Sequence, residues 1–126
     1  IYSTYIYIHR LVKARGYDAK IINGIPSFCA VSAKLEDSLA DRSEQIHIIP
    51  STYGVEDALN LSGTKVLMKA ASKMPLVKEA LKRSNTTCSM IENCGMPDEH
   101  IYHCIDEIPD QASYYSIIVV KEDHHD

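Results

Sequence analysis

The sequence predicts a single α/β domain in which a mixed sheet of about five to six strands packs against about four helices. Helix-like and strand-like segments alternate up to residue 83, which is typical of a sheet with helices packed on its faces. Three strand-like runs then follow with no helix between them, which favours antiparallel pairing. With 126 residues, of which 45% are hydrophobic, the chain is long enough for one compact core. We therefore expect residues 1–126 to form one domain.

The N-terminal region is expected to form a helix, a short strand and a second helix. Apolar residues recur at three- and four-residue steps between Tyr5 and Val12, Ser3 or Thr4 can cap the helix, and Gly16 ends it. Residues 17–23 then predict a strand, residues 24–27 a tight turn, and residues 28–35 the second helix.

The alternation continues from residue 45 to residue 83. We expect strands at 45–49 and 65–70, a short helix at 55–61 capped by Ser51 or Thr52, and a longer helix that opens near Ser72 and Pro75. Glu79 and Arg83 are four residues apart on the polar face of that longer helix, where they can pair. Three strands are then predicted at 86–92, 100–105 and 114–121, before a polar tail at 122–126 that we expect to fray.

Charge and composition disfavour several classes of protein. A formal net charge of -4 argues against binding to nucleic acid, which requires basic side chains for the phosphates. The apolar runs fall far short of the roughly 20 residues that cross a bilayer, so no contact with a membrane is expected. The cysteines form no dense framework, which indicates free thiols in a reduced, cytoplasmic setting; they are Cys29, Cys88, Cys94 and Cys104. Because the chain opens on Ile1 without a methionine, we expect it to be a fragment of a longer protein.

Few residues point to chemistry by their pattern alone. His100, His103 and the nearby cysteines have no CxxC spacing, so no metal site is predicted. No catalytic acid, base or nucleophile is identified, because histidines such as His9 and His47 are better explained as solvated residues. Lys69 and the Glu92-Asn93 pair sit at the ends of predicted strands, and open sheets often bind ligands beyond the carboxyl ends of their strands.

Four segments together resemble a known family. They are Tyr2-Ser3-Thr4, the run GIPSFCA from Gly24 to Ala30, the run VLMK from Val66 to Lys69, and Glu92-Asn93. In this order and spacing they resemble the second domain of the precorrin-2 or cobalt-precorrin-2 C20-methyltransferases, which are tetrapyrrole methylases. The resemblance spans nearly the whole chain.

The resemblance implies one half of a two-domain enzyme that binds S-adenosylmethionine in the cleft between its domains. The N-terminal domain of that enzyme would lie upstream of Ile1. The cofactor, which becomes S-adenosylhomocysteine as a product, is expected to contact Ile1, Tyr2, Ser3, Thr4, Pro26, Ser27, Met68, Asn93 and Cys94. Related methylases carry Asn-Gly where this chain has Asn93-Cys94.

The implied reaction is methyl transfer to carbon C20 of precorrin-2 or cobalt-precorrin-2 in cobalamin biosynthesis. The isolated chain is expected to be inactive without its N-terminal domain. A homodimer is expected because a domain without its neighbour exposes apolar surface. Two alternatives remain open, namely a methylase of another corrin or porphyrin ring position and a non-catalytic binding or assembly domain.

Overall fold

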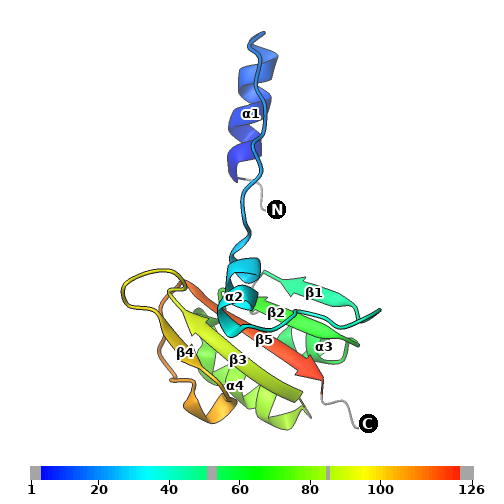
Figure 1. Cartoon of the computed structure of the whole chain (residues 1–126), viewed down its shortest axis with the longest axis vertical. Helices are drawn as coiled ribbons and strands as arrows, with labels where there is room; N and C mark the ends of the chain where they lie inside the picture. Colours follow the sequence, from blue (N-terminus) through cyan, green and yellow to red (C-terminus); the bar gives the residue numbers. More distant parts are fainter. Residues whose placement is uncertain (1–3, 51–53, 85, 123–126) are drawn as a thin grey trace.

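A mixed sheet with helices on both faces forms the body of the protein (Figure 1). The computed structural model describes residues 4–50, 54–84 and 86–122. The strands in these residues are β1 (Ile46–Ile49), β2 (Thr64–Met68), β3 (Thr86–Glu92), β4 (His100–Tyr102) and β5 (Ser116–Glu122). The helices are α1 (Thr4–Ala14), α2 (Ser27–Leu35), α3 (Val55–Leu59) and α4 (Met74–Arg83), with short 3-10 helices η1 (Ala70–Lys73) and η2 (Ile105–Glu107). The predicted α/β class is confirmed.

The sheet is parallel at one side and antiparallel at the other. Its strand order is β1-β2-β5-β3-β4. β1 and β2 are parallel, with α3 between them along the chain, whereas β5 is antiparallel to both β2 and β3, and β4 is antiparallel to β3. The antiparallel pairing of the last three predicted strands is therefore confirmed. The sequence left the strand order open, and β5 proves to lie at the centre.

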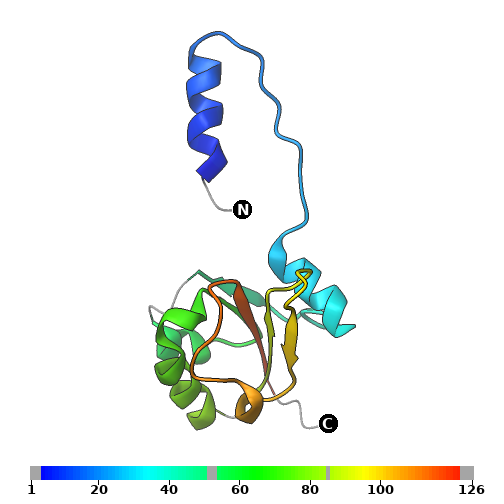
Figure 2. The same ribbon diagram turned by 90° about the vertical axis from the view of Figure 1, so that its left-hand side faces the viewer.

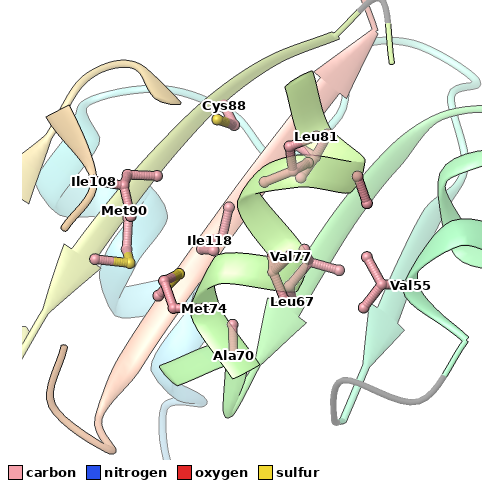
Figure 3. Close-up of a cluster of buried hydrophobic side chains, with 12 residues drawn as sticks. Val55, Leu67, Ala70, Met74, Val77, Leu81, Cys88, Met90, Ile108 and Ile118 are labelled. Atoms are coloured by element: carbon pink, nitrogen blue, oxygen red, sulfur yellow. The ribbon is translucent and has the colours of Figure 1, made fainter. Parts of the chain in front are cut away.

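Each face of the sheet has its own apolar core. α3 and α4 cover one face, and the side chains buried there include Leu67, Met90 and Ile118 (Figure 3). α2 covers the opposite face with Phe28 and Val31, which pack in a separate cluster with Val66, Ile91, Ile117 and Val119. Neighbouring residues of a strand point to opposite faces, so Ile117 to Val120 contribute to the two cores in turn. β5 is buried on both sides for this reason.

A buried ion pair joins β2 to the end of β5. Nζ of Lys65 lies 3.3 Å from Oε1 of Glu122, and the lysine side chain is only 1% exposed. The same carboxylate oxygen accepts a hydrogen bond of 3.0 Å from the backbone N-H of Gly63. A buried ammonium without a carboxylate partner would be strongly destabilising. Glu122, at the end of β5, supplies that partner for Lys65.

α1 projects away from the body of the protein at the end of an extended linker, residues 17–26 (Figures 1 and 2). None of its residues is buried. We call residues 4–25 the arm. Large apolar side chains are exposed all along it, at Tyr5, Tyr7, Ile8, Leu11, Tyr17, Ile21, Ile22 and Ile25. No helix among the described residues has the length and apolarity to cross a membrane.

The predicted strand at residues 17–23 is wrong for this structure. The segment is extended but forms no ladder with any described strand, because the arm carries it away from the sheet. Its pattern of apolar residues is that of a strand, yet a strand also requires a partner for its backbone groups.

Several other predicted elements are present but shorter. The run 100–105 is a strand only to Tyr102 before η2 begins, and the run 65–70 ends at Met68 because Lys69 turns the chain into η1. The helix 55–61 ends at Leu59, and the strand 114–121 is shifted to Ser116–Glu122. The predicted caps Ser3, Ser51 and Thr52 and the tail beyond residue 122 lie outside the described residues. Gly16 does end α1, and the Glu79 to Arg83 pair forms at 2.9 Å.

Gly63 allows β1 and β2 to start their pairing. Its φ of +96° lies in the region that favours glycine, and a Cβ at this position would stand 2.2 Å from the carbonyl oxygen of Gln45. That oxygen accepts the hydrogen bond from Thr64 N that begins the parallel ladder. The contact is with backbone, so no side chain can move aside.

We expect Gly63→Ala to lower the free energy of unfolding by about 2 to 4 kcal/mol, because the clash adds to backbone strain. Chemical denaturation measures this change. Gly95→Ala is the matched control, since Gly95 also has a positive φ (+80°) but no atom within 4 Å of an added Cβ. The control should lose only about 1 to 2 kcal/mol from the left-handed backbone. Equal losses in the two variants would contradict the proposed close approach.

Candidate functional site

An apolar cavity of about 440 Å³ opens at the edge of the sheet where β2 and β3 end and β5 begins. β2 and β3 both run antiparallel to β5, so their carboxyl ends reach the same edge. The first turns of α2, which carry Ser27 and Val31, form the wall of the cavity on the face of the sheet that α2 covers. The residues that line it are Ser27, Val31, Met68, Lys69, Ile91, Cys94, Met96, Tyr114, Tyr115, Ser116 and Ile117.

Several of the residues predicted from the sequence meet at this cavity. Ser27 begins α2, Met68 ends β2, and Cys94 lies in the loop after β3. Asn93 is buried directly before Cys94 and does not itself line the cavity. Residues from separate parts of the chain therefore converge near the strand ends at which Lys69 and Glu92-Asn93 were expected.

Pro26 and Thr4, two further predicted contacts that the structure describes, do not line this cavity. Pro26 is the half-buried residue before α2. Thr4 lies at the start of α1, which projects away from the domain (Figure 2). Ile1, Tyr2 and Ser3 lie outside the described residues, so their role stays a prediction.

Asn93 locks together the two loops that border the cavity. Its backbone has φ of +53°, a left-handed conformation that asparagine tolerates better than most residues. Its side-chain Nδ2 donates to Oδ2 of Asp98 at 3.0 Å, while its Oδ1 accepts from Oγ of Ser113 at 2.7 Å. Its backbone N-H donates to the carbonyl oxygen of Tyr115 at 2.8 Å. One buried residue thus ties the loop 93–99 to the loop 113–115.

A second set of contacts fixes the same loops to β3 and α2. Oε2 of Glu92 accepts a hydrogen bond of 2.6 Å from the backbone N-H of Ser113. Glu99 accepts from the backbone N-H of Gly95 at 2.7 Å and pairs with Lys34 of α2 at 3.3 Å. The bond from Gly95, with the help of Lys34, holds the pKa of the Glu99 carboxyl below its usual value. These contacts therefore attach the loops at the cavity to both β3 and α2.

Cys94 is a neutral thiol in this setting. Burial raises the pKa of the thiol above its ordinary value, and the negative charge of Glu99 adds to the effect, while Lys34 opposes it in part. Because the thiolate is the nucleophilic form of cysteine, the raised pKa favours Cys94 as a weakly polar lining group over a nucleophile.

The aromatic wall formed by Tyr114 and Tyr115 was not among the predicted contacts. Their rings meet edge to face at a centroid distance of 5.3 Å. Sequence patterning assigned Tyr114 to a strand, whereas the pair forms the loop just before β5. Two adjacent aromatic residues before a buried strand are the signal from which this wall could have been predicted.

The other large hollow lies between α3 and α4 and has a different character. Its volume is about 320 Å³. The Arg83 guanidinium that lines it is 2.9 Å from Glu79 and 3.6 Å from Glu56, so its positive charge is already engaged by two carboxylates. Among the described residues, no three His, Cys, Asp or Glu side chains gather in a way that could hold a metal ion. The apolar cavity is therefore the better candidate for a ligand site.

Comparison with known proteins assigns the chain to a family. The family profile described as Tetrapyrrole (Corrin/Porphyrin) Methylases matches residues 1–107. A curated protein of Methanocaldococcus jannaschii, a probable cobalt-precorrin-2 C(20)-methyltransferase, is 27% identical over 124 residues. The match covers 96% of this chain and 54% of that protein. This chain thus spans about half the length of the curated relative.

Solved structures show the same fold. A cobalt precorrin-4 methyltransferase of cobalamin biosynthesis matches with a TM-score of 0.78 at 16% identity, over 96% of this chain and 59% of that one. A uroporphyrin-III C-methyltransferase from Thermus thermophilus, complexed with S-adenosylhomocysteine, matches with a TM-score of 0.64 at 15% identity, over 94% and 60%. The match of the family profile to most of the sequence is decisive. The chain belongs to the tetrapyrrole methylases.

Proposed function

We propose that this chain forms one wall of the cofactor cleft of an S-adenosylmethionine-dependent C-methyltransferase. The proposed acceptor is C20 of precorrin-2 or cobalt-precorrin-2 in cobalamin biosynthesis. One observation carries the proposal: Ser27, Met68 and Cys94, which the family resemblance selects from distant parts of the sequence, line a single apolar cavity in the structure. The identity to the curated Methanocaldococcus jannaschii relative supports the choice of C20.

The cavity suits the adenosyl part of such a cofactor. Its wall is mainly apolar and includes Met68, Ile91, Ile117 and the Tyr114-Tyr115 pair. A flat aromatic base is well accommodated by aliphatic and aromatic side chains, and a few polar groups then fix its orientation. Ser27, Cys94 and Ser116 are uncharged polar groups of this kind at the cavity wall.

The residues of the cavity would act by positioning. A bound S-adenosylmethionine supplies an activated methyl group on a sulfonium sulfur, and the transfer replaces a carbon-sulfur bond by a carbon-carbon bond, with loss of a proton from the acceptor. The cavity walls hold their ligand in one orientation and exclude water, and positioning of this kind can be worth roughly 7 to 11 kcal/mol. Burial raises the pKa of the Cys94 thiol, which disfavours the thiolate, the form that could compete with the acceptor carbon for the methyl group.

The arm supports a second part of the proposal, in which a preceding α/β domain completes the cleft. Eight large apolar side chains of the arm are exposed, and contiguous apolar surface of this kind marks an interaction site. The extended linker also leaves backbone donors and acceptors free to pair with a strand. We further propose that the complete enzyme is a cytoplasmic homodimer.

The direct test is methyl transfer by a joined protein. The segment of the Methanocaldococcus jannaschii relative that precedes the matched region is fused to this chain, and the product of the reaction with S-adenosylmethionine and precorrin-2 or its cobalt form is analysed. We expect one new methyl group at C20. A methyl group at another carbon would indicate a different ring specificity, and a folded protein that gives no product would refute the proposed activity.

Blocking the cavity should weaken the binding of S-adenosylhomocysteine to the joined protein. Cys94→Trp places a large ring in the cavity, and we expect at least a tenfold loss of affinity for S-adenosylhomocysteine, or about 1.4 kcal/mol. Cys29→Trp is the matched control, because Cys29 is exposed on α2 and does not line the cavity. Isothermal calorimetry measures both variants. Equal affinities would place the cofactor elsewhere.

Loss of the Asn93 amide should weaken cofactor binding through the loops. Asn93→Gly keeps the left-handed backbone free of strain but removes the bonds to Asp98 and Ser113. We expect about 1 to 3 kcal/mol of lost stability and a roughly tenfold weaker affinity for S-adenosylhomocysteine, about 1.4 kcal/mol.

Thermal unfolding and calorimetry of the joined protein measure the two effects of Asn93→Gly. Asn60→Gly, at an exposed asparagine after α3, is the control and should leave the affinity unchanged. An Asn93→Gly protein with normal affinity would show that the loop network does not position the site.

A further inference from the structure

Lys69 occupies an unusual backbone conformation at the wall of the apolar cavity. It follows the last residue of β2 and has φ of +57° and ψ of +29°, in the left-handed region. A side chain with a Cβ in this region costs about 1 to 2 kcal/mol relative to the ordinary helical region, and glycine avoids that cost. A lysine here is therefore an unfavourable choice for the backbone alone.

Lys69 is also the only charged residue among the described residues that line the cavity. The ion pairs formed in the described part of the chain engage other lysines, namely Lys34, Lys65, Lys78 and Lys121. The contact recorded for Lys69 is made by its backbone carbonyl, which accepts a hydrogen bond from Oγ of Ser72 at 3.4 Å. Lys69 is an exposed residue, so its side chain is accessible to a ligand.

We propose that the ammonium of Lys69 binds a carboxylate of the ligand that fills this cavity. An apolar pocket with a single cation selects a molecule that has an apolar body and an anionic end. A charge-assisted hydrogen bond at the edge of an apolar pocket is stronger than one in open water. The strained backbone of Lys69 is explained if the side chain is kept for this contact.

The inference rests on the proposed function and extends it to a residue and a ligand group. Two molecules in the proposed reaction can supply the carboxylate. One is the amino-acid end of the S-adenosyl cofactor, and the other is a carboxylate side chain of the tetrapyrrole. The contact is the same in both cases, so the experiment must distinguish its source.

The backbone conformation provides a test that a purely structural role would not pass. Lys69→Met removes the charge and keeps a long apolar chain, whereas Lys69→Gly removes the charge and also relieves the left-handed backbone. If Lys69 only shaped the loop, Lys69→Gly would be at least as stable as the wild type and would bind ligands normally. If Lys69 anchors a carboxylate, both variants should lose affinity while Lys69→Gly keeps or gains stability. Lys69→Arg should retain most of the affinity.

Calorimetry on the joined protein with four probes identifies the source of the carboxylate. S-adenosylhomocysteine is compared with 5′-methylthioadenosine, which lacks the amino-acid end, and uroporphyrin III is compared with its octamethyl ester. If the cofactor supplies the carboxylate, Lys69→Met weakens S-adenosylhomocysteine about tenfold and leaves 5′-methylthioadenosine unchanged. If the tetrapyrrole supplies it, only uroporphyrin III is weakened. In either case, added salt should weaken the affected probe in the wild type and not in Lys69→Met.

Lys82→Met is the matched control, because Lys82 is exposed on α4 and does not line the cavity. It should leave all four affinities unchanged. If Lys69→Met and Lys69→Gly bind every probe as the wild type does, the inference is overturned while the proposed methyl transfer stands. If the wild type binds none of the four probes, the proposed function fails and the inference fails with it.

Discussion

The pairing of β5 with both β2 and β3 is the constraint on which the rest of the structure depends. It joins a parallel pair of strands to an antiparallel pair in one sheet, and its residues 117–120 enter the apolar cores on both faces. It also directs the carboxyl ends of β2 and β3 to one edge. The cavity exists at that edge because loops from both strands, and the loop that leads into β5, meet there.

The cavity combines an apolar interior with a polar frame. Partly buried hydrogen bonds of Asn93 and Glu92 hold the loops around it, and such bonds are costly to break because their groups are partly shielded from water. The interior itself presents mostly carbon and sulfur atoms. Rigid loops around an apolar interior favour selection of a ligand by shape. The one charged side chain among the described residues at the wall, Lys69, would then determine which end of the ligand lies beside it.

Sequence patterns predicted the local elements better than their arrangement. Periodicity identified α2, α4 and most strands, and Asn93 was expected at the end of a strand, where the structure has it. The central place of β5 was not predictable, because its apolar run does not specify which strands it separates. The segment 17–23 was wrongly assigned because a strand pattern says nothing about whether a partner is present. The left-handed backbone of Lys69 left no sign in the sequence, since glycine is the residue that usually reveals such a turn.

The isolation of α1 has a consequence for its own thermodynamics. Helices shorter than about 12 to 15 residues are marginal in water on their own, and α1 has 11 residues, none of them buried. Its helical order therefore gains nothing from the sheet and its cores. Whatever surface covers the apolar side chains of α1 would supply the missing free energy, so that association and helix formation become a single coupled equilibrium. The helix content of the arm would then depend on whether that surface is bound.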